Sequence, residues 1–250
     1  MEAIWAAAIK IGYKKDEVKK MTIIPLPALS DNYIWIIEKE KHIVVVDPSE
    51  ADLLLQLMAT KGYRLEAVLL THMHQDHIGG VEDLIAAHPA PVYGPKETGV
   101  ATEIVKGGEE IEALGEVFKV IATPGHTLGH VAYRMKEHLF IGDTLFLSSC
   151  GRVFSGDYEA MFESLAALKA MDDEVKVYSA HEYSLSNLEQ SVEYLKNDAT
   201  KNELERVRRL REEGAVTLPT TIGKEKQVNP FLVIDDFDEF VRYRKQRDRS

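Results

Sequence analysis

The chain has 250 residues, of which 45% are hydrophobic, 28% charged and 8% aromatic. This composition is typical of a globular protein with a sizeable core, and no apolar run approaches the roughly 18–20 residues that cross a bilayer. Forty-one acidic residues against thirty basic ones give a net charge of −11, which argues against nucleic acid as the main partner. Cys150 is the single cysteine, so an internal disulfide is excluded and a reducing, cytoplasmic compartment is expected.

Residues 1–20 lack the basic start, apolar centre and small-residue cleavage site of a signal peptide. We expect an N-terminal extension there, helix-prone or disordered, and assign it no function. The strand pattern begins only after Met21.

From residue 22 the chain alternates between predicted strands and helices. Runs rich in β-branched and aromatic residues, bounded by turn formers, predict strands at 22–26, 33–38, 42–48, 66–70, 117–125, 131–135, 138–143 and 175–180. Helical spacing of apolar residues predicts helices at 51–62, 78–88 and 159–171.

After residue 183 the pattern becomes mainly helical. Helices are expected at 185–197, 199–214 and 234–248, with a long connection over 214–230. We therefore predict an α+β protein with a metal-binding domain over 21–182 and a smaller helical, substrate-binding domain over 183–250.

The segment THMHQDH, residues 71–77, directly follows a predicted strand and is the strongest functional feature. It places His72, His74, Asp76 and His77 within six residues. On an extended segment, a spacing of two points His72 and His74 the same way. Imidazole and carboxylate ligands suit zinc, and also iron or manganese. The alternative is a polar surface loop that happens to be rich in histidine.

Three further candidates fall where predicted strands end. They are His126 in TPGH, Asp143 in IGD and His181 in SAH. With the first cluster they make seven side chains, enough for two adjacent metal sites with one bridging carboxylate.

Three nearby residues have competing interpretations. Asp47 in VVVDP either orients a ligand histidine or, more simply, forms a turn before Pro48. His130 is either structural or a support for the ligands. Cys150 is expected to be a packed thiol and not a nucleophile, because its CGR turn offers no base.

The motif T-H-x-H-x-D-H, with the later P-G-H, G-D and A-H, resembles the metallo-β-lactamase superfamily. Within it, the sequence is similar to the glyoxalase II branch (hydroxyacylglutathione hydrolase). The similarity lies in GDTLF, CGRVFSG (150–156), AHEY, NPFL (229–232) and the helical C-terminal region. It covers most of the chain from residue 22 onward and implies an αββα sandwich with the metals at one edge of the two sheets.

The resemblance also implies how the ligands divide between two divalent ions per chain. Three residues would hold each ion and one carboxylate would bridge them: His72, His74 and His126; Asp76, His77 and His181; and Asp143. It gives Asp76 and Asp143 catalytic roles, and zinc is the first choice of metal. A typical two-zinc lactamase has Cys where this chain has Asp143, which disfavours a lactamase. The acidic balance disfavours a nuclease.

The family binds the glycine carboxylate of glutathione through a basic residue in C-G-[KR] and an R-x-x-K pair near the C-terminus. Arg152 matches the first, and Arg242 with Lys245 match the second. Tyr183 in HEY matches the tyrosine that contacts the tripeptide. A solvated tail is the alternative for the basic run at 242–250.

Two of the residues expected near the substrate depart from the family pattern. Phe154, expected beside the substrate, stands where Tyr is frequent, and Ser155 stands where Glu is common. The missing hydroxyl removes a hydrogen bond, so these changes could weaken the affinity for glutathione or shift the preferred thiol.

Together these features predict a metal-dependent hydrolase of S-(2-hydroxyacyl)glutathione thioesters. We expect it to convert S-D-lactoylglutathione to D-lactate and glutathione, the second step of methylglyoxal detoxification, through a hydroxide that bridges the metals. We expect a monomer with no nucleic-acid or membrane partner. The alternatives are a superfamily hydrolase of another thioester, ester or lactone, an oxygenase of glutathione persulfide, and a non-catalytic metal-binding protein.

Overall fold

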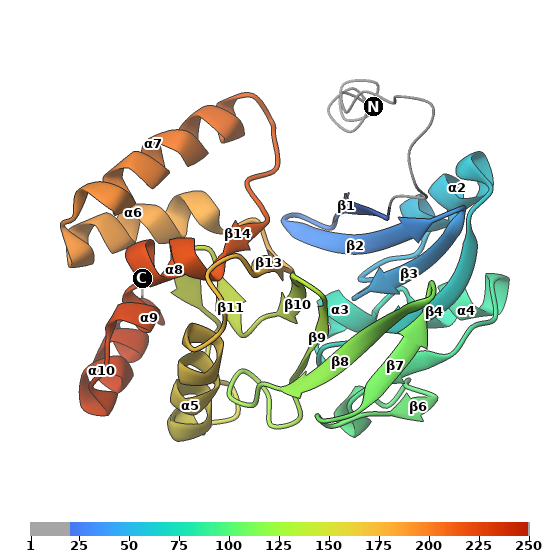
Figure 1. Cartoon of the computed structure of the whole chain (residues 1–250), viewed down its shortest axis with the longest axis horizontal. Helices are drawn as coiled ribbons and strands as arrows, with labels where there is room; N and C mark the ends of the chain where they lie inside the picture. The colour runs from blue at the N-terminus through green and yellow to red at the C-terminus, as the bar shows by residue number, and fades with distance from the viewer. Residues whose placement is uncertain (1–20, 250) are drawn as a thin grey trace.

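The computed structural model describes residues 21–249, so the extension predicted over 1–20 lies outside the described residues (Figure 1). Six strands form the first sheet, in the order β1 (Thr22–Ala28), β2 (Asn32–Lys39), β3 (His42–Val46), β4 (Arg64–Leu69), β5 (Val92–Gly94) and β6 (Glu103–Ile104). Its first three strands pair antiparallel, and β3 to β6 pair parallel.

A second six-stranded sheet has the order β14 (Thr220–Thr221), β13 (Lys176–Ser179), β10 (His138–Gly142), β9 (Val131–Met135), β8 (Glu116–Ala122) and β7 (Glu110–Ala113). Only β10 and β13 run parallel within it. A short hairpin, β11 (Leu145–Phe146) and β12 (Ser149–Cys150), follows β10.

Side chains along each strand point alternately to the two faces of the sheet, and this separates the core between the sheets from the cores on their outer faces. In β2, Trp35 and Ile37 face the second sheet and share a core with Phe118 and Phe140, whereas the neighbours of Trp35 face outward. Both faces of the first sheet are therefore buried, as expected for strands covered on two sides.

Helices cover the outer faces of both sheets. On the outer face of the first sheet, α2 (Asp52–Lys61) and α4 (Val81–Ala87) bury Leu54, Met58 and Leu84 among its outward side chains. The short α3 (Gln75–Ile78) and the 3-10 helix η1 (Lys96–Thr98) lie in the connections after β4 and β5. On the second sheet, α5 (Tyr158–Lys169) packs Met161, Leu165 and Leu168 into the core that holds the outward side chains of β10 and β13. This arrangement confirms the predicted αββα sandwich.

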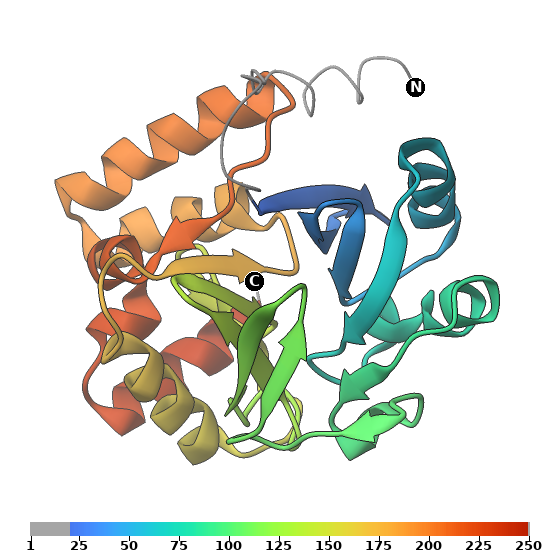
Figure 2. The ribbon, with the colours of Figure 1, turned by 45° about the vertical axis from the view of Figure 1, so that its right-hand side comes forward.

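The C-terminal region is mainly helical, as predicted. Its helices are α6 (Ser184–Leu195), α7 (Asp198–Glu212), α8 (Ile222–Val228), α9 (Pro230–Val233) and α10 (Phe237–Arg247). Figure 2 shows them, in orange and red, gathered on the side of the second sheet and opposite the teal helices of the first. No helix within residues 21–249 is both long and apolar enough to cross a membrane.

One predicted helix and one predicted connection differ from the structure. The helix predicted over 78–88 begins only at Val81, as α4, because Gly79 and Gly80, which separate it from α3, lie against the backbone of Ser49 and Glu50. A Cβ at Gly80 would come within 2.4 Å of the Glu50 carbonyl carbon. The connection predicted over 214–230 contains β14 and the seven-residue α8.

Candidate metal centre

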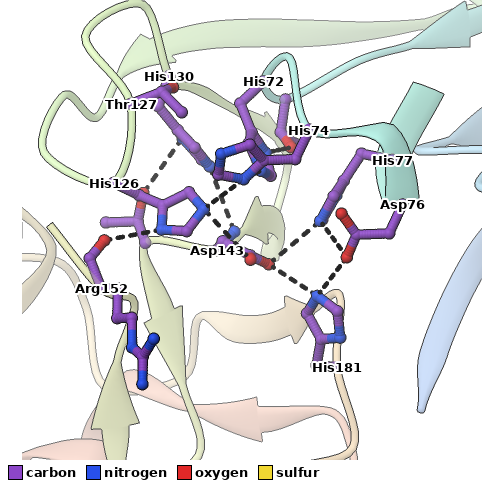
Figure 3. A network of polar contacts seen from close by, with 12 residues as sticks. His72, His74, Asp76, His77, His126, Thr127, His130, Asp143, Arg152 and His181 are labelled. Atoms are coloured by element: carbon purple, nitrogen blue, oxygen red, sulfur yellow. Dashed lines mark hydrogen bonds and ion pairs between the residues drawn. The ribbon is translucent and has the colours of Figure 1, made fainter. Parts of the chain in front are cut away.

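The predicted ligands converge at one edge of the two sheets (Figure 3). The segment after β4 brings four of them from the first sheet: His72, His74, Asp76 and His77. His126, Asp143 and His181 follow β8, β10 and β13 of the second sheet. Each sheet thus supplies part of a site that neither could build alone.

The first group consists of three imidazoles. Nδ1 of His74 lies 3.0 Å from Nε2 of His72 and 2.9 Å from Nε2 of His126. His126 donates its Nδ1–H to the Arg152 carbonyl at 2.8 Å, which leaves Nε2 as a lone-pair donor for an ion. His72 lies 3.0 Å from the Thr71 hydroxyl through Nδ1, so its Nε2 is likewise directed at the site.

The second group combines Asp76 with His77 and His181. Oδ2 of Asp76 lies 3.6 Å from Nε2 of His77 and 3.3 Å from Nε2 of His181. Both rings are fixed from behind by carboxylates. His77 Nδ1 lies 2.9 Å from Asp47, and His181 Nδ1 lies 2.7 Å from Asp31.

Asp143 lies between the groups and presents one oxygen to each. Its Oδ1 is 3.5 Å from Nε2 of His77 and 3.4 Å from Nε2 of His181. Its Oδ2 is 3.4 Å from Nε2 of His126. This is the geometry that a bridging carboxylate requires.

The residues fit two divalent ions. Bonds of about 2.0–2.2 Å to an ion place neighbouring ligand atoms roughly 3.0–3.5 Å apart, close to the separations of 2.9–3.6 Å within the two groups. Nε2 of His77 and Oδ1 of Asp143 are buried and make no hydrogen bond. Buried polar atoms are normally satisfied, so these two indicate atoms placed to bind a cation.

Electrostatics in the metal-free chain agree with this reading. Burial lowers the pKa of His72 well below its usual value, which favours the neutral imidazole that binds metals. Burial also lowers the pKa of His77, but the carboxylates of Asp143 and Asp47 outweigh it and raise that pKa to about 10. A divalent ion that binds His77 would displace the proton held on its ring.

Family comparisons agree with the fold. The model of the metallo-beta-lactamase superfamily matches residues 29–103 and 99–181. The chain belongs to this superfamily. Residues 182–249 match the model described as the hydroxyacylglutathione hydrolase C-terminus, which places the chain in the glyoxalase II family.

Solved structures of superfamily proteins share the architecture. ETHE1 from Myxococcus xanthus is 26% identical, with 91% of this chain and 92% of that chain covered and a TM-score of 0.72. The protein TTHA1623, solved in a di-iron-bound form, is 27% identical over 84% of this chain and all of its own, with a TM-score of 0.61. BLEG-1, a B3 metallo-beta-lactamase, is 25% identical over 86% of this chain and all of its own, with a TM-score of 0.65.

Two histidines of the second ligand group depend on carboxylates whose role the sequence left open or did not reveal. Asp47 accepts hydrogen bonds from the backbone N–H and hydroxyl of Thr71, at 2.8 and 2.7 Å, in addition to facing His77. It is therefore an orienting carboxylate and not only a turn former. Asp31 was missed, because it lies 150 positions from His181 and no local motif links the two.

His130 supports the bridge. Its Nε2 accepts the backbone N–H of Asp143 at 3.2 Å, and its ring stacks on His72 with centroids 4.9 Å apart. Burial holds the pKa of His130 well below its usual value, so the ring is neutral and can accept that hydrogen bond. The structure thus favours a supporting role for His130.

Two glycines of the motifs are required by close approach. Gly142, just before Asp143, has φ 52°, and a Cβ there would lie 2.4 Å from the Thr71 hydroxyl. A Cβ at Gly151 would lie 1.9 Å from the Asp143 carbonyl oxygen. The strand end at Asp143 can therefore pack against its neighbours only if both positions lack a side chain.

Two of the predicted substrate residues border the site. The Phe154 ring is 63% exposed, and its centroid lies 5.3 Å from those of His74 and His126. Tyr183 stacks on His181 with centroids 4.6 Å apart and ring planes 6° apart. The two aromatic rings therefore flank different groups of ligands.

The predicted basic residues lie further out. Arg152 touches the site through its backbone carbonyl, while its guanidinium extends away from His126 (Figure 3). Arg242 and Lys245 line an open cavity of about 530 Å³ at the C-terminal end of α10, with Gln246 and Arg249. Cys150 is buried, and burial raises the pKa of its thiol to about 11, which excludes it as a thiolate nucleophile at neutral pH.

Proposed function

We propose that this chain hydrolyses S-(2-hydroxyacyl)glutathione thioesters, with S-D-lactoylglutathione as substrate and D-lactate and glutathione as products. This would be the second step of methylglyoxal detoxification. The observation that carries the proposal is the pair of ligand groups joined by Asp143 in a chain whose residues 182–249 match the hydroxyacylglutathione hydrolase C-terminus.

We assign His72, His74 and His126 to one divalent ion, Asp76, His77 and His181 to the other, and Asp143 to both. Zinc is our first choice for a set of imidazoles and carboxylates. Iron is the main alternative, supported by the di-iron form of a structural neighbour, and manganese also accepts these ligands. When bound, such ions supply Lewis acidity toward a carbonyl and activate water near neutral pH.

The chain's own residues set the charge of the site. Asp76 and Asp143 supply two negative charges, which offset only half the charge of two divalent ions. The remaining positive charge favours an oxyanion that develops on the thioester carbonyl. The leaving thiol has an ordinary pKa of about 8.5, so its departure does not require a strong general acid. The reaction therefore needs no Ser or Cys nucleophile.

Recognition of the thiol is assigned to the residues around the rim. Phe154 and Tyr183 flank the two ligand groups and would border the thioester. Arg152, Arg242 and Lys245 would attract the carboxylates of glutathione. The basic cavity at α10, in a chain of net charge −11, supports the binding of an anionic group there. We keep the monomer as part of the proposal, to be checked by light scattering.

The test is hydrolysis of S-D-lactoylglutathione by purified protein, with metal ions counted on the same sample. We expect saturable turnover and close to two ions per chain, with activity lost on chelation and restored by adding metal. Two ions without turnover would reject the glutathione thioester and redirect the search to other thioesters, esters and lactones. Fewer than two ions in the metal-saturated protein would reject the dinuclear site.

A further inference from the structure

The guanidinium of Arg152 is engaged by an acidic residue of the same chain. Its Nε lies 3.4 Å from Oδ1 of Asp248, and its Nη2 donates to the Asp248 backbone carbonyl at 3.2 Å. Asp248 directly follows α10, which ends at Arg247. The basic residue matched to the substrate carboxylate thus already faces a carboxylate.

Asp248 is held in place from its other side. The same Oδ1 lies 3.0 Å from Nη2 of Arg244, one turn earlier on the helix. Arg244 is itself buried, donates Nη1 to the Cys150 carbonyl at 2.7 Å and lies over the Phe231 ring. Because Arg244 is anchored in the core, it fixes the Asp248 carboxylate against Arg152.

This placement affects any anion that approaches Arg152. A substrate carboxylate must either displace Asp248 from the guanidinium or bind beside a charge that is already compensated. Arg152 is half-exposed, so its pair with Asp248 contributes modestly and can be exchanged. A thiol without a carboxylate at this position meets no such competition.

We infer that Asp248 is a specificity-determining residue, whose carboxylate competes with the carboxylate of an anionic thiol for Arg152. The inference rests on the proposed function, because it assumes that the thiol of the substrate reaches Arg152. Tight binding of an anionic thiol then depends on Arg242 and Lys245, whose charged side chains line the separate cavity at α10. In this way Asp248 lowers the preference for glutathione relative to less acidic thiols.

The primary test is Asp248→Asn, which removes the charge that faces Arg244 and Arg152 and keeps a side chain of nearly the same shape. We expect the KM for S-D-lactoylglutathione to fall about two- to fivefold, the range expected for an exposed charge pair, with kcat unchanged. The KM for the lactoyl thioester of N-acetylcysteamine, a thiol without carboxylates, should stay the same. Asp235→Asn is the matched control, because it removes the same charge from an exposed partner of Lys169.

A second measurement separates this inference from the proposed function. Binding of S-methylglutathione, which cannot be hydrolysed, is measured by calorimetry for the metal-loaded wild type, Arg152→Ala, Asp248→Asn and the double variant. Arg152→Ala should weaken binding less than twofold alone and about two- to fivefold in the Asp248→Asn background. Equal effects in both backgrounds would overturn the role of Asp248.

The kinetic and calorimetric measurements can each be interpreted if the other fails. Absence of turnover in every variant would reject the proposed function, and the calorimetric comparison would still decide whether Asp248 masks Arg152. If Asp248→Asn lowers the melting temperature strongly, Asp248→Ser provides a second neutral variant. A KM for S-D-lactoylglutathione that is unchanged in both folded variants would overturn the inference.

Discussion

At the scale of single residues, Asp143 affects both ligand groups, since its two oxygens face Nε2 of His126 on one side and those of His77 and His181 on the other. Asp143→Asn would place an amide N–H toward one of these groups and remove the shared charge. We expect bound metal to fall below two ions per chain. Activity should drop by more than the roughly 10–100-fold that is typical when a residue that only supports a metal ligand is lost. Metal content and kcat on one preparation check this, and a variant with two ions and the wild-type rate would contradict the bridging role.

Individual residues also show what the sequence can reveal about the site. His72, His74, Asp76 and His77 share a seven-residue motif, and the other three ligands each follow a predicted strand, so all seven were accessible to sequence reasoning. Asp31 was not, because only the fold brings it to His181. The side-chain partner of Arg152 was also hidden, since Asp248 lies 96 positions away.

At the scale of helices and strands, the length of an element determines whether the sequence predicts it. Long apolar runs such as β2 and β3 were expected almost at their observed bounds, because a run of five or more β-branched and aromatic residues between turn formers is a strong signal for a strand. The strands β5, β6, β7 and β14, of two to four residues, and the helix α8 were missed. Such short elements are stabilised by pairing with distant segments and carry little pattern of their own.

The missed helix α8 carries a buried carboxylate that connects three segments. Glu225 accepts hydrogen bonds from the Ser148 backbone N–H, the Thr220 hydroxyl and the Asn229 amide at 2.7–2.8 Å. Burial raises the pKa of Glu225 to about 7, although these hydrogen bonds act in the opposite direction. In its protonated form, Glu225 could donate to the Thr220 hydroxyl and keep the other two bonds.

This carboxylate should make stability depend on pH. Because the folded-state pKa lies above the unfolded value of 4.5, folding favours the protonated form, and stability is lost as pH rises from about 4.5 through 7. The shift corresponds to about 3 kcal/mol. Glu225→Gln reproduces the protonated form at every pH, so its free energy of unfolding should gain about that much relative to wild type between pH 4.5 and 8.

Urea unfolding of the two proteins across this pH range provides the measurement. Metal-free protein is used for both, so that proton competition at the histidines does not enter the comparison. A difference between variant and wild type that stays constant with pH would show that Glu225 is ionised in the folded chain throughout. Glu189→Gln is the control, because Glu189 is an exposed partner of Arg208.

At the scale of the whole molecule, the metal centre connects two sheets that otherwise meet through an apolar core. Trp35 and Leu69 of the first sheet pack against Phe118 and Phe140 of the second in that core. The ligands at its edge also come from both sheets. In the metal-free chain, the cationic forms of His77 and His181 balance the charge of Asp143. The fold should therefore persist without metal, but with lower stability.

We expect metal binding to stabilise the whole domain and not only the loops that hold the ligands. An ion present at 100 times its Kd contributes about 2.7 kcal/mol if it binds only the folded chain, and about 2–4 °C of Tm accompanies each kcal/mol in a chain of this size. Two ions should therefore raise Tm by about 10 °C or more in calorimetry of metal-loaded against chelated protein. Because both sheets supply ligands, hydrogen exchange should slow in β4 and in β10 together. Asp143→Asn should show a much smaller rise in Tm, and slowing confined to one sheet would contradict a site shared between the two.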